Sequence, residues 1–151
     1  MDVPFDHHSV LLVEDNPDDA FLMKSAWKSA RISNPLPLVT DGEQALDYLH
    51  GRGDYSDRRK FPMPVAVFLD LKLPRIDGLE VLAAIREDPG LCRLHVDVLS
   101  ASARSADIEK ALALGANNYF MKPSRVEDLV QMVSSWSTLA RFKMYAVPGA
   151  R

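Results

Sequence analysis

The sequence predicts an α/β fold in which helices cover both faces of a parallel sheet. The chain has 151 residues, of which 47% are hydrophobic and 26% are charged, a composition typical of one globular domain. Short apolar runs alternate with amphipathic stretches along the chain. The stretches between the runs are long enough to form crossover helices, so successive strands run parallel and the connections are right-handed.

The first strand and the helix after it carry clear signals. Residues 10–13 are all apolar, which is typical of a strand buried in a parallel sheet. Asn16 can cap a helix that has Pro17 at its first position, where the missing N–H needs no partner. Two acidic residues follow and favour the positive end of the helix dipole. We therefore expect a helix over residues 17–30.

The second strand is expected at an edge of the sheet. It spans residues 36–40 and contains Pro37, which cannot donate a hydrogen bond to a neighbouring strand. Asp41 and Gln44 then resemble a capping box that opens the second helix. Gly51 is expected to end that helix.

The rest of the chain repeats the pattern. Apolar runs predict three further strands, at residues 65–69, 96–101 and 118–121. Helices are expected after each of them, one that stops near Pro89, one over residues 104–114, and one opened by a capping box of Ser124 and Glu127.

The long polar segment 50–64 is unusual for an α/β connection. Its basic run, residues 58–60, is balanced by Asp54 and Asp57. We therefore expect a solvated loop and not a phosphate or nucleic-acid site.

Composition excludes several classes of protein. The formal net charge is −3, which argues against binding through the nucleic-acid backbone. No apolar run exceeds five residues, so a membrane span is not expected, and the N-terminus lacks the pattern of a secretory signal. The single cysteine, Cys92, cannot form an intramolecular disulfide and suits a reducing cytoplasm.

Polar side chains follow four of the predicted strands. Glu14 and Asp15 follow the first, Asp70 the third, Ser100 ends the fourth and Lys122 follows the fifth. The carboxyl ends of parallel strands form one edge of the sheet, where ligands bind, so these side chains are expected to meet. Three adjacent carboxylates repel one another, and a divalent cation such as Mg²⁺ removes that repulsion.

This set of groups suits phosphoryl transfer. An ionised carboxylate can attack phosphorus without a histidine base, provided that it is positioned and that charge is neutralised. Lys122 can pair with a carboxylate or with a phosphoryl oxygen. Ser100 can donate to an oxygen of the transferred group.

These residues and their spacing resemble the receiver domain of two-component response regulators. The resemblance rests on Leu12-Val13-Glu14-Asp15-Asn16, on Asp70 with Leu73-Pro74 and Asp77-Gly78 after it, on Ser100-Ala101 and on Lys122-Pro123. It covers residues 9–140, between an expected flexible N-terminus (residues 1–8) and a C-terminal tail (residues 141–151). It implies one flavodoxin-like domain, a doubly wound five-stranded parallel sheet in the order 2-1-3-4-5. The long loop and the lack of an output segment make the chain similar to small single-domain, phytochrome-associated response regulators.

The resemblance also implies roles for individual residues. Asp70 would accept a phosphoryl group from a phosphohistidine of a sensor histidine kinase. Mg²⁺ would be held by Glu14, Asp15, Asp70 and the backbone carbonyl of Lys72. Ser100 and Lys122 would bind the aspartyl phosphate, and Tyr119 would be the aromatic switch that changes the surface of the fourth helix, fifth strand and fifth helix.

The resemblance implies a signalling protein and not an enzyme with substrate turnover, since the chain would only phosphorylate itself with Mg²⁺ and slowly release the phosphate. Its expected partners are a sensor kinase, for which a phytochrome is one candidate, and a downstream protein. The fourth helix, fifth strand and fifth helix are a candidate homodimer surface. Neither membrane nor nucleic-acid contact is expected.

Two residues depart from the family pattern. Lys72 stands two residues after the acceptor, where small polar residues are usual, and we expect it to alter the lifetime of the aspartyl phosphate. Asp97 interrupts the fourth predicted strand, where a charge lowers stability unless it is paired or solvated.

Alternative interpretations remain open at this point. Taken alone, the segment 14–17 is also a helix-start signal, and Asp70 could simply be an acid that ends a strand. A Mg²⁺-dependent phosphohydrolase of the haloacid-dehalogenase type also forms an aspartyl phosphate, but it carries a second acid where this chain has Lys72. A receiver-like scaffold that has lost phosphorylation is the other alternative.

Overall fold

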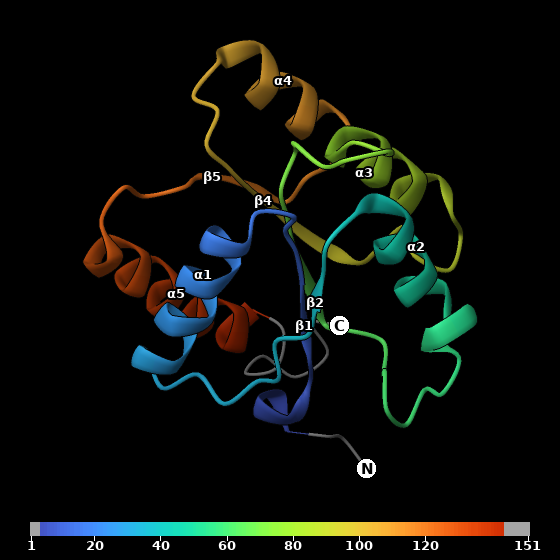
Figure 1. Cartoon of the computed structure of the whole chain (residues 1–151), viewed down its shortest axis with the longest axis horizontal. Coiled ribbons are helices and arrows are strands. Elements are labelled where there is room, and N and C mark those ends of the chain that lie inside the picture. The colour runs from blue at the N-terminus through green and yellow to red at the C-terminus, as the bar shows by residue number, and fades with distance from the viewer. Residues whose placement is uncertain (1–3, 144–151) are drawn as a thin grey trace.

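The computed structural model describes residues 4–143 and contains one parallel sheet of five strands in the order β2-β1-β3-β4-β5 (Figure 1). This is the flavodoxin-like order, so the predicted fold class and topology are confirmed. The strands are β1 (Val10–Val13), β2 (Leu38–Val39), β3 (Ala66–Leu69), β4 (His95–Ser100) and β5 (Asn118–Met121). All four pairings between neighbours are parallel.

Five α-helices cover the sheet on both faces (Figure 1). They are α1 (Pro17–Ser29), α2 (Gly42–His50), α3 (Gly78–Glu87), α4 (Ser105–Ala113) and α5 (Val126–Arg141). Helices α1 and α5 lie together on one face, and α2, α3 and α4 lie on the other. Two short 3-10 helices, η1 (Phe5–His7) and η2 (Gly53–Tyr55), complete the described elements.

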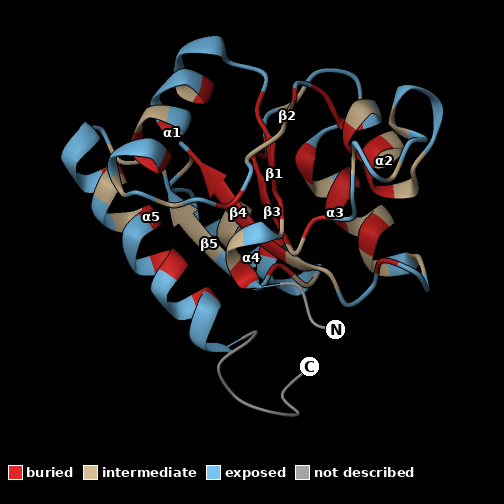
Figure 2. Cartoon of the chain, turned by 90° about the horizontal axis from the view of Figure 1, so that it is seen from below, coloured by how far each residue is buried: buried red, intermediate tan, exposed pale blue. Residues whose placement is uncertain are grey.

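The core has one layer on each side of the sheet, and β1 contributes to both. Leu11 and Val13 pack beneath α2 and α3, whereas Val10 and Leu12 pack beneath α1 and α5. All four side chains are buried, as the colouring of Figure 2 shows for the central strands. Burial on both faces explains why this strand is continuously apolar and does not alternate.

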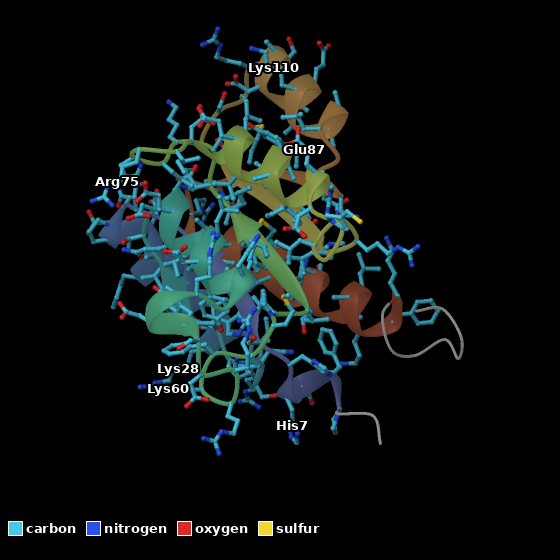
Figure 3. All side chains as sticks on the ribbon, turned by 90° about the vertical axis from the view of Figure 1, so that its right-hand side faces the viewer. His7, Lys28, Lys60, Arg75, Glu87 and Lys110 are labelled. Atoms are coloured by element: carbon cyan, nitrogen blue, oxygen red, sulfur yellow. The ribbon has the colours of Figure 1, made fainter. Side chains whose placement is uncertain are left out.

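Charged side chains lie mainly outside these layers. Lys110 on α4 and Glu87 at the end of α3 are both exposed and lie at the surface (Figure 3). Within residues 4–143, no helix has the length and apolar character needed to cross a bilayer.

The predicted start of α1 is confirmed in detail. The Asn16 side chain accepts hydrogen bonds from the backbone N–H groups of Asp18 and Asp19, at 2.9 and 3.1 Å. The helix begins at Pro17, as predicted. This cap fixes the direction of the first turn of α1, which faces the carboxyl ends of the strands.

The predicted capping boxes have a different outcome. Asp41 caps α2, because its side chain accepts from the backbone N–H of Gln44 at 2.8 Å. The Gln44 side chain, however, accepts from the backbone N–H of Thr40, one residue before the N–H of Asp41 that a capping box would use. The prediction of a capping box formed by Ser124 and Glu127 is wrong. Helix α5 begins at Val126, and its first turn has no side-chain cap.

The expected chain ends also differ from the structure. Residues 5–7 form η1, Phe5 is buried, and the Asn34 amide donates to the carbonyls of Phe5 and His8 at 2.7 and 2.9 Å. The described part of the N-terminus is therefore packed against the domain. Arg141, expected in the tail, is the last residue of α5, and residues 144–151 lie outside the described part of the chain.

The segment after α2 is also more structured than expected. Arg58 donates to the carbonyls of Tyr48, Leu49 and Phe61 at 2.7, 2.6 and 3.0 Å. The rings of Tyr48, Tyr55 and Phe61 contact one another, with centroids 5.1 to 5.9 Å apart. The prediction of a solvated loop is wrong for Arg58, because carbonyl groups at the end of a helix attract a cation.

Asp97 finds its partners in the tertiary structure. It is fully buried on β4 and accepts hydrogen bonds from the side chains of His95, Asn118 and Trp136. A buried carboxylate needs such donors to offset its desolvation. The unusual strand residue therefore connects β4 with β5 and α5.

Candidate functional site

Three carboxylates converge at the carboxyl ends of β1 and β3. Glu14, Asp15 and Asp70 each offer an oxygen, and these oxygens lie within 4.8 Å of one another. Val13 and Leu69 are paired in register, so the residues that follow them leave the sheet side by side. Hard oxygen ligands in this number suit a small divalent cation.

The three carboxylates differ in burial. Glu14 and Asp70 are only 4% and 6% exposed, whereas Asp15 faces solvent. The pKa of Glu14 is raised to about 7, mainly by burial and also by the charge of Asp70, against the opposing effect of Lys122. The inner part of the site therefore disfavours a second full negative charge beside Asp70.

Lys122 lies at the centre of the acidic cluster. Its Nζ lies 2.7 Å from Glu14 Oε1, 3.0 Å from Asp70 Oδ2 and 2.8 Å from Asp19 Oδ2. Burial lowers the pKa of Lys122, but hydrogen bonds to Asp19, Glu14 and Asp70 outweigh burial and raise it. The ammonium group therefore keeps its charge.

The fold places Lys122 by extending β5. Its backbone N–H donates to the carbonyl of Ser100 at 2.8 Å, one step beyond the last paired residues of β4 and β5. Because β4 lies between β5 and β3, the side chain reaches past the end of β4 to contact Asp70 and Glu14. The structure thus brings together four of the residues proposed from the sequence, namely Glu14, Asp15, Asp70 and Lys122.

Asp19 is the site residue that the sequence analysis did not identify. It lies in the first turn of α1, where acidic residues are ordinary because of the helix dipole. The sequence signal that was available is its position at the start of the helix that follows Glu14 and Asp15, and that signal does not single out Asp19 from Asp18.

Ser100 and Tyr119 are both linked to Ser102. Ser100 is buried, and its hydroxyl accepts from the backbone N–H of Ser102 at 3.2 Å. The Tyr119 hydroxyl donates to the Ser102 carbonyl at 2.8 Å. Ser100 also borders a cavity of about 220 Å³ that Leu71 and Lys72 help to line. A displacement of Ser100 would therefore reach Tyr119 through one intervening residue.

The loop after β3 folds tightly over Asp70. The backbone N–H of Lys72 donates to Asp70 Oδ1 at 3.3 Å, and the Lys72 side chain is exposed. Gly78 donates to the Leu71 carbonyl at 2.8 Å, and a Cβ on Gly78 would lie 2.3 Å from the carbonyl oxygen of Asp70. Glycine is therefore required for this close approach, which gives the Asp77-Gly78 motif a steric reason.

Comparison with known proteins now identifies the family. Residues 10–134 match the model of the response regulator receiver domain. The chain belongs to that family. As a receiver domain it is 37% identical over 124 residues to the response regulator Rcp1 of Synechocystis sp., and the match covers 82% of each chain.

Solved structures of receiver proteins agree with this assignment. A response regulator of red light signalling in R. palustris has a TM-score of 0.84 and 36% identity, and the match covers 96% of both chains. The phosphorylated cyanobacterial phytochrome response regulator RcpA has a TM-score of 0.80 and 35% identity over 93% of this receiver domain and 96% of that chain. The Mn²⁺-bound form of Rcp1 has a TM-score of 0.77 and 34% identity, with 93% and 96% covered.

Proposed function

We propose that this receiver domain accepts a phosphoryl group on Asp70 from a phosphohistidine of a sensor histidine kinase. The observation that carries the proposal is the contact of Asp70 with Lys122 beside the two further carboxylates of Glu14 and Asp15. The relative RcpA, whose structure is phosphorylated, supports the same chemistry.

In the proposed reaction an oxygen of Asp70 forms a bond to phosphorus while the bond between phosphorus and the histidine nitrogen breaks. Lys122 stays protonated and donates to the oxygens that carry charge in the transition state. Asp70 needs no base because its carboxylate has no proton to lose. The domain does not turn over an external substrate, so it acts as a phosphoacceptor and not as a conventional enzyme.

A divalent cation fits the acidic cluster. We assign Mg²⁺ to Glu14, Asp15, Asp70 and the carbonyl of Lys72, and the Mn²⁺-bound form of Rcp1 supports a divalent metal in this family. When bound, the metal supplies positive charge that offsets the repulsion between carboxylates and an incoming phosphoryl group. Asp15 is the exposed member of the set, so its side chain is the one best placed to meet an ion that arrives from solvent.

Phosphorylation is proposed to signal through Ser100 and Tyr119. A phosphoryl group adds about −1.5 to −2 charge and new acceptor oxygens, which favour a shift of the Ser100 hydroxyl toward Asp70. That shift releases the bond between Ser100 and the backbone of Ser102, to which Tyr119 is also bound. The change then reaches the surface formed by α4, β5 and α5.

The same surface is the proposed contact for partners. It exposes apolar side chains from all three elements, namely Leu112 on α4, Met121 on β5 and Leu139 on α5, together with Leu114 directly after α4. We propose homodimerisation or docking of a downstream protein on it, in the cytoplasm, with output through protein contact. Sedimentation with and without beryllium fluoride, a mimic of the phosphoryl group, tests whether the mass changes on activation.

The kinase is proposed to be a phytochrome. This rests on the relatives, because RcpA is a phytochrome response regulator and the R. palustris protein acts in red light signalling. Phosphoryl transfer from purified candidate phytochromes, compared with kinases of other sensory classes, tests the assignment. Faster transfer from a kinase of another class would contradict it.

The decisive experiment for Asp70 is labelling by a small phosphodonor with Mg²⁺. The wild type is expected to be labelled once per chain, Asp70→Asn not at all, and Asp88→Asn, which removes an acid at the end of α3, like the wild type. Asp15→Asn is expected to need much more Mg²⁺. Labelling that persists in Asp70→Asn would overturn the assignment, and steady release of phosphate from phosphomonoesters would favour the phosphohydrolase alternative.

A further inference from the structure

One of the three partners of Lys122 lies outside the cation-binding cluster. Asp19 Oδ2 is 2.8 Å from Lys122 Nζ, a contact as short as those made by Glu14 and Asp70. Asp19 comes from α1 and is not among the three carboxylates that converge within 4.8 Å. Its contact with Lys122 therefore has no explanation in metal binding.

Three carboxylate oxygens compete for the ammonium group of Lys122. Two of its three N–H bonds donate to Asp19 and Asp70, at 2.8 and 3.0 Å, and Glu14 Oε1 forms an ion pair with it at 2.7 Å. A phosphoryl oxygen on Asp70 would have to compete with these carboxylates for Lys122, so we expect one of the present contacts to be released or shared.

Burial indicates which bond is released. The side chain of Glu14 is 4% exposed and that of Asp70 8%, whereas the side chain of Asp19 is 37% exposed. A buried carboxylate that loses its cation is left unpaired in a poorly solvated place. Asp19 can take up water instead, so the loss of its contact is the least unfavourable of the three.

We propose that Asp19 is a positioning residue that restrains Lys122 in the unphosphorylated domain and releases it to the phosphoryl group. The proposal rests on the proposed function of Asp70. Asp19 touches neither the phosphorus nor the metal set, and it acts only through the lysine. Its effect is on how readily the ammonium group turns toward the incoming charge.

The structure offers a matched control in Asp18. It carries the same charge in the same helical turn, but its side chain is exposed and, within residues 4–143, has no hydrogen-bond or ion-pair partner. The backbone N–H groups of both acids donate to the side-chain oxygen of Asn16. Asp18→Asn thus reproduces the loss of charge near the start of α1 without changing Lys122.

The test compares the initial rate of labelling by a small phosphodonor at saturating Mg²⁺. Asp19→Asn is expected to be labelled roughly two- to five-fold faster than Asp18→Asn, the range that corresponds to loss of one partly exposed ion pair. Equal rates in the two variants overturn the proposal. A slower rate in Asp19→Asn also overturns it, because it would mean that Asp19 assists the lysine and does not restrain it.

A double-mutant cycle separates an effect through Lys122 from a simple change in the local field. In a Lys122→Gln background, Asp19→Asn is expected to have no effect on the labelling rate or on the affinity for beryllium fluoride with Mg²⁺, measured by calorimetry. The same increase in both backgrounds overturns the positioning role. If the Lys122→Gln variant is not labelled and does not bind beryllium fluoride, the comparison of labelling rates between Asp19→Asn and Asp18→Asn decides.

Failure of this inference is distinguishable from failure of the proposed function. If wild type and Asp70→Asn are labelled alike, the function of Asp70 fails before Asp19 is considered. If the wild type is labelled on Asp70 and the two α1 variants behave alike, only the role of Asp19 fails. Unfolding curves of both variants show whether either change acts through stability.

Discussion

The indole N–H of Trp136 donates a 2.6 Å hydrogen bond to the carboxylate of Asp97, and this bond joins α5 to the middle of β4. Asp97 is completely buried, with further bonds from His95 and Asn118. The Trp136 ring also contacts Phe68 and Trp27, with centroids 4.9 and 5.6 Å away. A charged group on a core strand thus helps to fix the helix that borders the proposed partner surface.

Trp136→Phe is expected to lower the free energy of unfolding by about 1.5 to 3 kcal/mol, because it removes a donor from a buried charge. Trp27→Phe is the control, since the Trp27 indole donates at 2.8 Å to the neutral carbonyl of Asn34. That loss is expected to be smaller, about 0.5 to 1.5 kcal/mol. Urea unfolding of both variants gives the comparison, and equal losses would contradict a special contribution of Asp97.

Glu14→Gln is expected to stabilise the metal-free domain at neutral and alkaline pH. Burial raises the pKa of Glu14 from 4.5 to about 7, so between these values the folded state binds the proton more tightly than the unfolded state. The contribution of Glu14 to stability is therefore lost as pH rises through this window. We expect Glu14→Gln to gain about 1 to 3 kcal/mol near pH 8 and little near pH 5.

The measurement for Glu14 is denaturant unfolding with a chelator at both pH values. Glu87→Gln, which changes an exposed glutamate at the end of α3, serves as the control and is expected to show no such difference. A gain that is independent of pH would show that it does not come from the titration of Glu14.

Lys72→Asn is expected to shorten the lifetime of the aspartyl phosphate several-fold. The Lys72 side chain is exposed next to Asp70, and its positive charge can hold phosphoryl oxygens and hinder the approach of water. The rate is measured by loss of label after the donor is removed. Lys28→Asn, a change of an exposed lysine in the last turn of α1, is the control. An unchanged rate in Lys72→Asn would show that the prediction is wrong.

Arg58→Gln is expected to lower stability by about 2 to 3 kcal/mol because Arg58 binds three backbone carbonyls, two of them at the end of α2. Arg59→Gln changes the next residue, whose side chain is 95% exposed, and is expected to alter stability by less than about 0.5 kcal/mol. Thermal or urea unfolding distinguishes the two. Similar small effects would mean that the loop after α2 is held by its aromatic contacts alone.

Much of the fold follows from the sequence because its signals are local. The continuous apolar run of β1, the Asn16 cap and Pro17 at the start of α1 each depend on neighbouring residues, and the structure has them where they were predicted. The box at Ser124 failed because the same local pattern is also compatible with an uncapped first turn that starts at Val126. Local rules place an element well, but they place its ends less well.

The sequence by itself determined the α/β class, the strands that end in acids and the residues that meet at one edge of the sheet. Only the tertiary structure revealed Asp19 as a partner of Lys122 and identified the partners of Asp97. Lys122 and Asp19 are 103 residues apart, and Asp97 and Trp136 are 39 apart. Such pairs depend on how α1 and α5 pack on one face of the sheet, and packing is set by the sum of many apolar contacts and not by any short motif.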